Sequence, residues 1–313
     1  MTHRSTYDVA VVGGGAAGLS AAVPLARSLR SVLVVDAGDP RNAPAAGAHN
    51  VLGHEGIAPL ELLAAGRREA QGYGAEVRRD RAVGARRDDA GFELDLDAGG
   101  TVRARRLLLA TGLTDELPDV PGVRELWGRS VLHCPYCHGW EVRGRRIGVL
   151  GTSAMSVHQT LLFRQLSDDV TLFVHTMPDP GDEAWEQLAA LDVRTIDGTV
   201  SGLAVEDDVL RAVVLEGGRE LGVDAVAVAP RFLARAELYE KLGGQLAEHP
   251  TGWFIPTAQM GRTDVPGVWA AGNVSNLSAS VSVAMGEGVT AAAGINADLV
   301  AENALAAVRA RTM

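Results

Sequence analysis

The stretch Tyr7-Asp8-Val9-Ala10-Val11-Val12-Gly13-Gly14-Gly15-Ala16-Ala17-Gly18 decides the fold, because a short apolar run passes directly into a glycine-rich turn. The sequence becomes helix-like at 19–28, and a second apolar run at 31–35 ends in Asp36. Strand, glycines, helix, strand and acid in this order form the fingerprint of a dinucleotide-binding βαβ unit. The sequence therefore predicts an α/β fold that begins with a nucleotide site.

Each residue of the fingerprint has a physical role in such a site. Gly13 allows the tight turn, Gly15 lets the backbone approach a pyrophosphate, and Gly18 lets helix and strand pack closely. The amino-terminal end of the helix holds the phosphates, and Asp36 accepts the ribose hydroxyls. The glycine pattern alone would also fit a βαβ unit without a ligand, but the complete order of elements favours nucleotide binding.

Bulk composition bounds the remaining function classes. The chain has 313 residues, of which 47% are hydrophobic and 22% are charged, as expected for about two globular domains. Its net charge of −10 disfavours nucleic acid or an anionic membrane surface as a partner. No apolar run approaches the ~18 residues of a membrane span, and the first residues contain no apolar signal region. We therefore expect a cytoplasmic protein that binds neither nucleic acid nor a membrane.

The two cysteines of the chain lie together in Cys134-Pro135-Tyr136-Cys137-His138-Gly139-Trp140. A spacing of three puts both sulfurs on one face of a first helical turn, so they can close and reopen a small disulfide ring. The helix amino terminus and a neighbouring imidazole favour a thiolate, which electron transfer requires. A zinc site would need a second cysteine pair, and a purely structural disulfide is typical of secreted chains. The motif therefore predicts redox chemistry and no metal site.

A second, damaged copy of the nucleotide-binding pattern follows the cysteines. Ser153 and Ser156 stand where a pyrophosphate site calls for glycine or alanine. A repeated unit of this kind indicates a second domain of the same ancestry. The repeat consists of strand-like sequence at 147–150, a turn at 151–156, a helix at 157–166 and a strand at 170–174.

The charges of this second unit disfavour NADPH. Between Arg164 and Arg194 there is no lysine or arginine, whereas the 2′-phosphate of NADPH requires one just after the second strand. NADH stays open as an alternative through Asp179, although Ser153 weakens it. We interpret the unit as a scaffold for the cysteines. The same interval contains seven acids, namely Asp168, Asp169, Asp179, Asp182, Glu183, Glu186 and Asp192.

The remaining apolar segments extend the two units. A long helix of small residues is expected from Ser280 to Ala301, with Gly286 and Gly288 inside it. Glycine costs a helix about 1 kcal/mol relative to alanine, so close packing against a ligand or a strand is the expected compensation. The amino terminus of this helix either faces a reduced flavin or packs within its own domain. The other expected elements are a helix at 60–70, antiparallel strands laid across the main sheet at 76–105, and strands at 107–112, 224–229 and 265–270.

These pieces together resemble the low-molecular-weight thioredoxin reductase class of the pyridine nucleotide-disulfide oxidoreductases, over essentially the whole chain. The resemblance rests on the fingerprint with Asp36, on Asn50, on Ala110-Thr111-Gly112, on the cysteine motif before a second Rossmann unit, and on Gly267-Val268-Trp269-Ala270-Ala271-Gly272-Asn273. It implies two Rossmann-like, three-layer ββα domains, the first discontinuous and the second inserted and degenerate. The implied boundaries are 1–114 and 234–313 for an FAD-binding domain and 115–233 for the cysteine-bearing, NAD(P)-type domain.

The resemblance also implies FAD as the cofactor, a homodimer, and a site in which Cys137 lies beside flavin C4a while Cys134 meets the substrate. The residues then expected around FAD are Gly13, Gly15, Ala16, Ala17, Gly18, Asp36, Arg41, Asn42, Asn50, Val83, Ala110, Thr111, Gly112, Gly272, Asn273, Ser280 and Val281.

Three departures from the class point to a particular reaction. His138 stands where the class usually has aspartate, Asn273 replaces the acid of the last motif, and the nicotinamide fingerprint is missing. This combination is similar to the FAD-dependent dithiol oxidases that close the disulfides of gliotoxin, holomycin and romidepsin, the bacterial holomycin type above all. The similarity implies that a small-molecule dithiol of the dithiolopyrrolone type becomes a disulfide. Electrons then pass through the cysteines and FAD to O2, giving H2O2.

His138 is the expected base of that reaction, and Cys134 and Cys137 are the expected redox pair. The unperturbed histidine pKa of ~6.5 lets the ring take a thiol proton near neutrality, whereas an aspartate near ~3.9 is a poor base. A structural role at the start of the helix is the alternative for this side chain. For the whole protein, a thioredoxin reductase driven by NAD(P)H or ferredoxin stays open, as does a flavin redox sensor without turnover.

Overall fold

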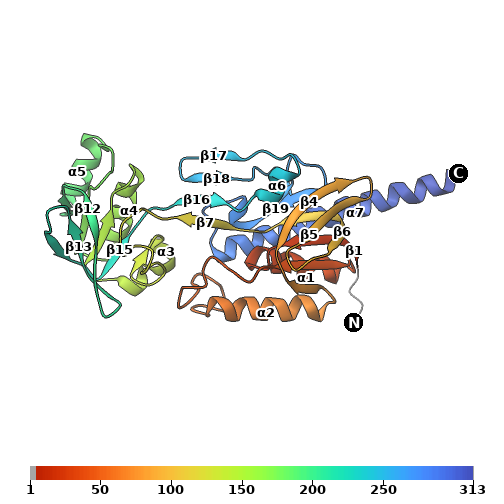
Figure 1. Ribbon diagram of the computed structural model, residues 1–313, viewed down its shortest axis with the longest axis horizontal. Helices are drawn as coiled ribbons and strands as arrows, with labels where there is room; N and C mark the ends of the chain where they lie inside the picture. The colour runs from red at the N-terminus through yellow and green to blue at the C-terminus, as the bar shows by residue number, and fades with distance from the viewer. Residues whose placement is uncertain (1–4, 313) are drawn as a thin grey trace.

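Two α/β units make up the protein. The computed structural model describes residues 5–312, and Figure 1 shows the two units joined by extended segments, with α7 projecting away at the carboxyl end. The first unit contains a seven-stranded sheet in the order β3-β2-β1-β6-β5-β4, to which β19 is added beside β6. Its strands are β1 (Thr6–Val12), β2 (Val32–Asp36), β3 (Glu76–Arg79), β4 (Ala82–Asp88), β5 (Gly91–Leu96), β6 (Thr101–Leu109) and β19 (Val268–Ala270).

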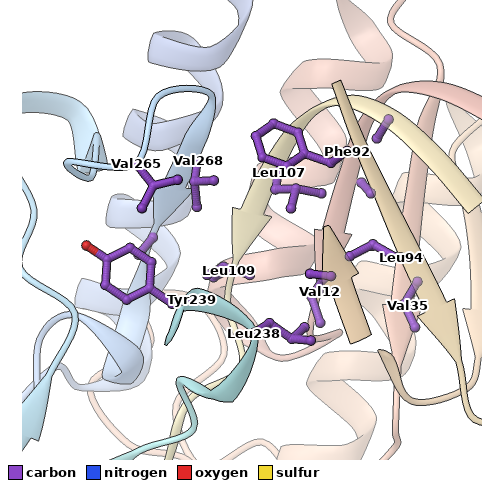
Figure 2. Close-up of a cluster of buried hydrophobic side chains, with 14 of the residues drawn as sticks. Val12, Val35, Phe92, Leu94, Leu107, Leu109, Leu238, Tyr239, Val265 and Val268 are labelled. Carbon is purple, nitrogen blue, oxygen red and sulfur yellow. The ribbon is translucent and has the colours of Figure 1, made fainter. Parts of the chain in front are cut away.

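The first sheet is covered on both faces, because successive residues of its parallel strands point to opposite sides. One face packs against α1 (Ala16–Arg27) and α7 (Val281–Thr312). On the other face, Phe92 and Leu94 of β5, an antiparallel strand of the same sheet, lie in one buried cluster with Val12 and Val35 (Figure 2). Leu94 is fully buried, so truncating it to alanine would cost about 2–5 kcal/mol.

The parallel strands of the first sheet end at a common edge. β1 pairs in parallel with β2 and with β6, and β19 pairs in parallel with β6. Helix α2 (Pro59–Gly72) leads into β3, which pairs in parallel with β2. The prediction of antiparallel strands at 76–105 is therefore wrong for β3, because a helical crossover returns the chain in the same direction. It is confirmed for β4, β5 and the start of β6.

The second unit repeats this architecture on a smaller scale. Its five-stranded parallel sheet has the order β11-β10-β9-β15-β8, and the antiparallel strands β12 to β14 cover one face. The helices α4 (Met155–Arg164) and α5 (Asp182–Ala190) belong to the opposite face. The strands are β8 (Val131–Leu132), β9 (Ile147–Leu150), β10 (Val170–Phe173), β11 (Arg194–Ile196), β12 (Val200–Glu206), β13 (Val209–Leu215), β14 (Glu220–Gly222) and β15 (Ala225–Ala227).

The chain passes between the units along two neighbouring strands. β7 (Leu113–Glu116) leaves the first unit, and β16 (Arg231–Ala234) returns to it in antiparallel register, with Glu116 opposite Arg231. The predicted boundaries at 114 and 233 fall within these strands and stay a prediction. The remaining elements are α3 (Pro135–His138), η1 (Trp140–Val142), α6 (Glu237–Lys241), β17 (Ala247–His249), β18 (Gly252–Phe254), η2 (Gln259–Gly261) and η3 (Gly272–Val274).

The structure confirms the two-unit α/β architecture with mixed sheets. Most predicted elements are found within a few residues of the expected ends. The largest difference is α7, which runs to Thr312 and not to residue 301. No helix within residues 5–312 is both long and apolar enough to cross a bilayer.

Candidate active site

A single large cleft runs from the first unit to the cysteine pair of the second. Its volume is about 2930 Å³, which exceeds the ~300–1,000 Å³ of a pocket for one small ligand and leaves room for a dinucleotide and a substrate. Cys134, Cys137 and His138 line it. Every residue expected around FAD also lines it except Gly18, namely Gly13, Gly15, Ala16, Ala17, Asp36, Arg41, Asn42, Asn50, Val83, Ala110, Thr111, Gly112, Gly272, Asn273, Ser280 and Val281.

The turn between β1 and α1 has the form of a phosphate cradle. Gly13 has φ +109°, and a Cβ there would lie 2.2 Å from the carbonyl oxygen of Ala110, so no larger residue fits. Gly15 precedes α1 without any side-chain cap and has no atom within 4 Å of a Cβ position. Gly18 lets α1 pack closely against the turn, since a Cβ added there would lie 1.9 Å from the Gly13 carbonyl oxygen. The uncapped helix amides therefore open toward the cleft, as a pyrophosphate site requires.

Asp36 lies at the end of β2 in the place expected for ribose recognition. Its carboxylate accepts a hydrogen bond from the Gly38 backbone at 2.9 Å. Its other oxygen forms an ion pair with Arg67 of α2 at 2.9 Å. Sequence reasoning missed Arg67, because the two residues are 31 positions apart and no spacing rule connects them. Arg67 fixes the carboxylate at the edge of the cleft.

Asn273 is held by a small polar network beside the cleft. Its amide nitrogen donates to the carbonyl oxygens of Asn276 at 3.1 Å and Ala279 at 3.0 Å. Its side-chain oxygen accepts a hydrogen bond from Arg41 at 3.3 Å, and Arg41 also forms a bidentate pair with Asp115. Asn273 lines the cleft, and an amide oxygen has two lone pairs, so it can also accept a hydrogen bond from a hydroxyl of a ribityl chain.

The first turns of α7 approach α1 closely. A Cβ on Gly288 would lie 2.1 Å from the carbonyl oxygen of Ala17, so this glycine permits helix contact. Gly286 has no neighbour within 4 Å of its Cβ position and lines the cleft. The prediction of close packing against a ligand or a strand is therefore wrong at Gly288, because its close contact is with helix α1. The carboxylate of Glu287, which sequence reasoning missed, accepts a hydrogen bond from the Gly272 backbone amide at 2.9 Å.

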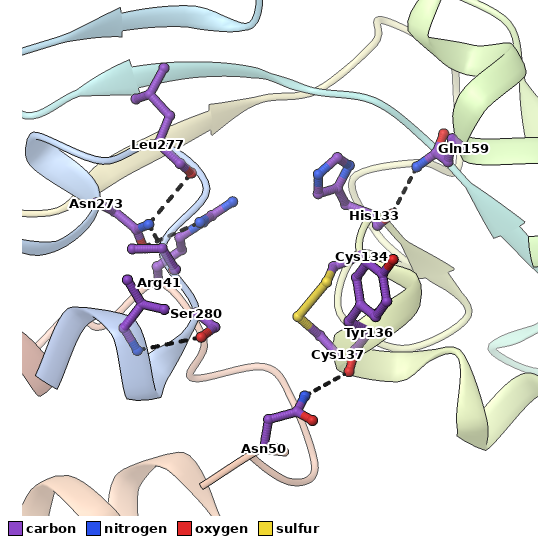
Figure 3. Close-up of a disulfide and its surroundings, with 12 residues drawn as sticks. Arg41, Asn50, His133, Cys134, Tyr136, Cys137, Gln159, Asn273, Leu277 and Ser280 are labelled. Carbon is purple, nitrogen blue, oxygen red and sulfur yellow. Dashed lines mark hydrogen bonds between the residues drawn. A yellow bond between two sulfur atoms is a disulfide. The ribbon is translucent and has the colours of Figure 1, made fainter. Parts of the chain in front are cut away.

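The cysteine pair faces the first unit across the cleft. Cys134 and Cys137 form a disulfide at the start of α3, with their Cα atoms 5.2 Å apart. Asn50 of the first unit, at φ +60°, donates its side-chain amide to the Tyr136 carbonyl at 2.9 Å. Figure 3 shows the disulfide on one side of a gap whose other side carries Asn273 and Ser280. The structure thus brings the predicted redox pair and the predicted cofactor residues to opposite walls of one space.

His138 ends α3 and is half-buried. Its Nε2 atom is enclosed and, within residues 5–312, has no hydrogen-bond partner. Burial lowers the pKa of His138 below 6.5, with Glu141 opposing this and His49 adding to it. The ring is therefore neutral at pH 7 and available to accept a proton. Because a buried polar atom without a partner is uncommon, this unpaired nitrogen fits a proton-transfer role.

His49 connects the two units, which the sequence did not indicate. It pairs with Glu55 of its own loop at 2.8 Å and with Glu141 of the second unit at 3.4 Å. A loop histidine of this kind is more often merely solvated. Trp140, at the end of the cysteine motif, does not line the cleft, and the Arg143 guanidinium stacks over its ring, with Cζ 3.9 Å from the ring centroid.

In the glycine-poor turn of the second unit, the side chain of Ser156 occupies the backbone amides. Ser156, fully buried, accepts hydrogen bonds from the amides of Thr152 at 3.1 Å and Ser153 at 3.4 Å. These are the amides that would face a phosphate in an intact fingerprint. Asp179, the one acid left for an NADH ribose, accepts hydrogen bonds from the Gly181 amide and the Trp185 indole.

The fold and the site together define a flavin- and disulfide-dependent oxidoreductase. The chain belongs to the pyridine nucleotide-disulphide oxidoreductase family, whose sequence model matches residues 7–288. It is similar to the thioredoxin reductase tcpT of Claviceps purpurea (strain 20.1), with 34% identity over 96% of this chain and 97% of that protein. It is also similar to the crystal structure of HlmI, with 46% identity, a TM-score of 0.93 and coverage of 100% and 98%. An oxidoreductase from Agrobacterium tumefaciens gives 35% identity, a TM-score of 0.89 and coverage of 94% and 99%.

Family membership makes this chain an FAD-dependent thiol oxidoreductase. The expectations of the fold class, of the enzyme class and of FAD are confirmed. The uncapped backbone amides at the start of α1 and the free space beside Gly15 fit the pyrophosphate of FAD. The roles assigned to single residues stay predictions.

Proposed function

We propose that the protein is a dithiol oxidase: it closes an intramolecular disulfide in a small-molecule dithiol, and O2 is the electron acceptor. The product disulfide is of the dithiolopyrrolone type, and H2O2 is released. The active protein is a cytoplasmic homodimer. When bound, FAD would supply the two-electron acceptor for the reduced cysteine pair and the connection to O2. The residues that hold it are those of the α1 turn, Asp36, Asn273 and the first turn of α7.

The contrast between the two βαβ turns carries this proposal. At Gly15 the amides of α1 are uncapped and accessible from the cleft, whereas the hydroxyl of Ser156 occupies the amides of the second turn. A nicotinamide dinucleotide would have to displace that buried hydroxyl, and no lysine or arginine lies between Arg164 and Arg194, where a 2′-phosphate site needs one. Electrons therefore enter from the thiol side.

The chain's own residues perform the thiol chemistry. A neutral His138 takes the proton of the first substrate thiol, and the thiolate attacks the sulfur of Cys134. The disulfide opens, Cys137 leaves as a thiolate, and a mixed disulfide joins Cys134 to the substrate. The second substrate thiol then attacks the mixed disulfide at the substrate sulfur, which releases the cyclic product and leaves both cysteines reduced.

Anaerobic reduction of the holoenzyme tests the proposal. We expect anaerobic mixing with dithiothreitol to bleach the flavin absorbance, and mixing with NADH or NADPH to leave it unchanged. Readmitted air should restore the colour and yield one H2O2 for each dithiol oxidised. Rapid bleaching by NADPH or NADH would instead make the protein a thioredoxin reductase. Bleaching by dithiols without repeated turnover under air would make it a redox sensor.

A further inference from the structure

His133 is a second imidazole beside the disulfide, and the reaction above leaves it unused. It directly precedes Cys134 and lines the cleft. Figure 3 shows its ring near Cys134, on the disulfide's side of the gap and opposite Asn273 and Leu277. The ring position is defined by two contacts. Nδ1 lies 3.0 Å from the Val228 carbonyl oxygen, and the ring meets Phe232 edge-on at 5.3 Å.

These contacts determine which nitrogen of His133 carries the proton. A carbonyl oxygen only accepts hydrogen bonds, so Nδ1 must be the protonated nitrogen and Nε2 the bare one. Gln159 strengthens this arrangement, because its amide donates both to the His133 carbonyl at 2.8 Å and to the Val228 carbonyl at 3.1 Å. Gln159 is buried, so it keeps both carbonyls in place.

The surroundings of His133 also keep the ring neutral. Burial lowers the pKa of His133 below 6.5, and the Val228 hydrogen bond only partly opposes this. The charged groups that act on the ring are Arg41, which lowers its pKa, and Asp115, which raises it. They form a salt bridge with each other at 2.6 Å, so their effects on the ring oppose each other. The two groups in direct contact with the ring, the Val228 carbonyl and the Phe232 ring of β16, are uncharged.

We propose that Nε2 of His133 accepts the proton of the second substrate thiol, while His138 accepts that of the first. This inference rests on the proposed function. The reaction releases two protons from the dithiol, and two neutral imidazoles flank the two cysteines. In the step assigned to His133, the second S–H bond breaks and its proton goes to Nε2. The new thiolate forms the substrate S–S bond, and the bond between Cys134 and the substrate breaks with its electron pair on Cys134.

The test separates the two thiol steps. 2-Mercaptoethanol has one thiol, so one molecule can form the mixed disulfide but cannot carry out the intramolecular second step, whereas dithiothreitol can complete both steps. Oxidised holoenzyme is mixed anaerobically with each thiol, quenched with acid, and weighed by mass spectrometry. In His133→Gln we expect the 2-mercaptoethanol adduct to form at the parent rate. The dithiothreitol adduct should accumulate because its release is slowed about 100-fold or more. His54→Gln, an exposed loop histidine outside the cleft, should behave like the parent.

The pH profile distinguishes proton transfer from packing. In the parent, adduct release should be constant above the lowered pKa of the ring and fall at more acid pH. In His133→Gln it should rise about tenfold per pH unit up to the thiol pKa of ~8.5, because the free thiolate must form unaided. Added imidazole should restore release in His133→Ala. Flavin content and thermal unfolding show whether each variant is folded. If neither variant is folded, the pH profile of the parent alone tests the inference.

Three outcomes would overturn the inference. One is a variant that releases the adduct at the parent rate with the parent pH profile. Another is equal slowing of both thiol steps, which would make His133 a structural residue. A parent release rate that keeps rising with pH through neutrality would also exclude a neutral imidazole acceptor. Failure of the parent enzyme to react with either thiol would instead refute the proposed function, and this inference with it.

Discussion

Gly15→Ala is expected to weaken FAD binding while leaving the stability of the apoprotein nearly unchanged. The backbone at Gly15, with φ −80° and ψ −171°, is accessible to alanine, and no atom lies within 4 Å of the new methyl group. Alanine is the poorer N-cap by about 0.5–1 kcal/mol. It also stabilises by about 0.4–1 kcal/mol through the unfolded chain. The two effects nearly cancel, so the free energy of unfolding should change by less than about 0.5 kcal/mol.

The effect on the cofactor should be much larger. The methyl group would stand on the surface that a pyrophosphate approaches, and overpacking costs about 1–3 kcal/mol. At about 1.4 kcal/mol per factor of ten, the Kd for FAD should rise about 5- to 150-fold. Titration of the apoprotein with FAD, followed by flavin fluorescence, measures this. Thermal unfolding of the same apoprotein measures stability.

Gly288→Ala provides the matched control, because its methyl group would meet the Ala17 carbonyl at 2.1 Å inside the contact of α1 with α7. We expect that variant to destabilise the apoprotein by about 1–3 kcal/mol. Parent-like FAD affinity in Gly15→Ala would refute the assignment of the α1 turn as the pyrophosphate cradle. Loss of apoprotein stability in Gly15→Ala would show that the turn is packed against protein.

Five further outcomes are expected. His138→Ala should slow first-adduct formation about 100-fold or more. The parent rate of that step, by stopped-flow, should rise as the pH rises through the lowered pKa of His138 and level off below pH 7. Arg67→Ala should leave Asp36 unpaired and reorient it, raising the FAD Kd by isothermal titration, whereas Arg67→Lys should recover part of the affinity. Ser156→Gly should free two turn amides and allow weak NADH binding, seen as tryptophan quenching, without NADPH binding. Burial also lowers the pKa values of His133 and His175, so the unfolded state takes up protons first as the pH falls below 6.5, and the thermal midpoint should decrease between pH 7 and 5.

Local sequence patterns predicted the elements and most of the cleft. The α1 fingerprint and the cysteine motif define geometry over a few residues, and the structure places both where the pattern indicates. β3 was assigned the wrong direction because a four-residue strand carries no signal of its partner. Its direction is decided by the crossover through α2.

Contacts between distant residues were not predictable. Arg67 reaches Asp36 from a helix whose register against β2 depends on packing. His49 reaches Glu141 only because the two units meet at that loop. The serine at 156 was recognised as a missing glycine, but its role depends on the rotamer that aims the hydroxyl back at the turn. Each of these contacts depends on the tertiary arrangement, and no spacing in the sequence indicates it.

The pairing of β7 with β16 bears on how such a protein is assembled from parts. Because Glu116 and Arg231 stand opposite each other in an antiparallel ladder, the whole intervening segment leaves and re-enters the first unit at neighbouring points. A two-residue hairpin turn would span that distance. A hairpin turn in place of the cysteine-bearing segment would therefore leave the strand order of the cofactor unit unchanged.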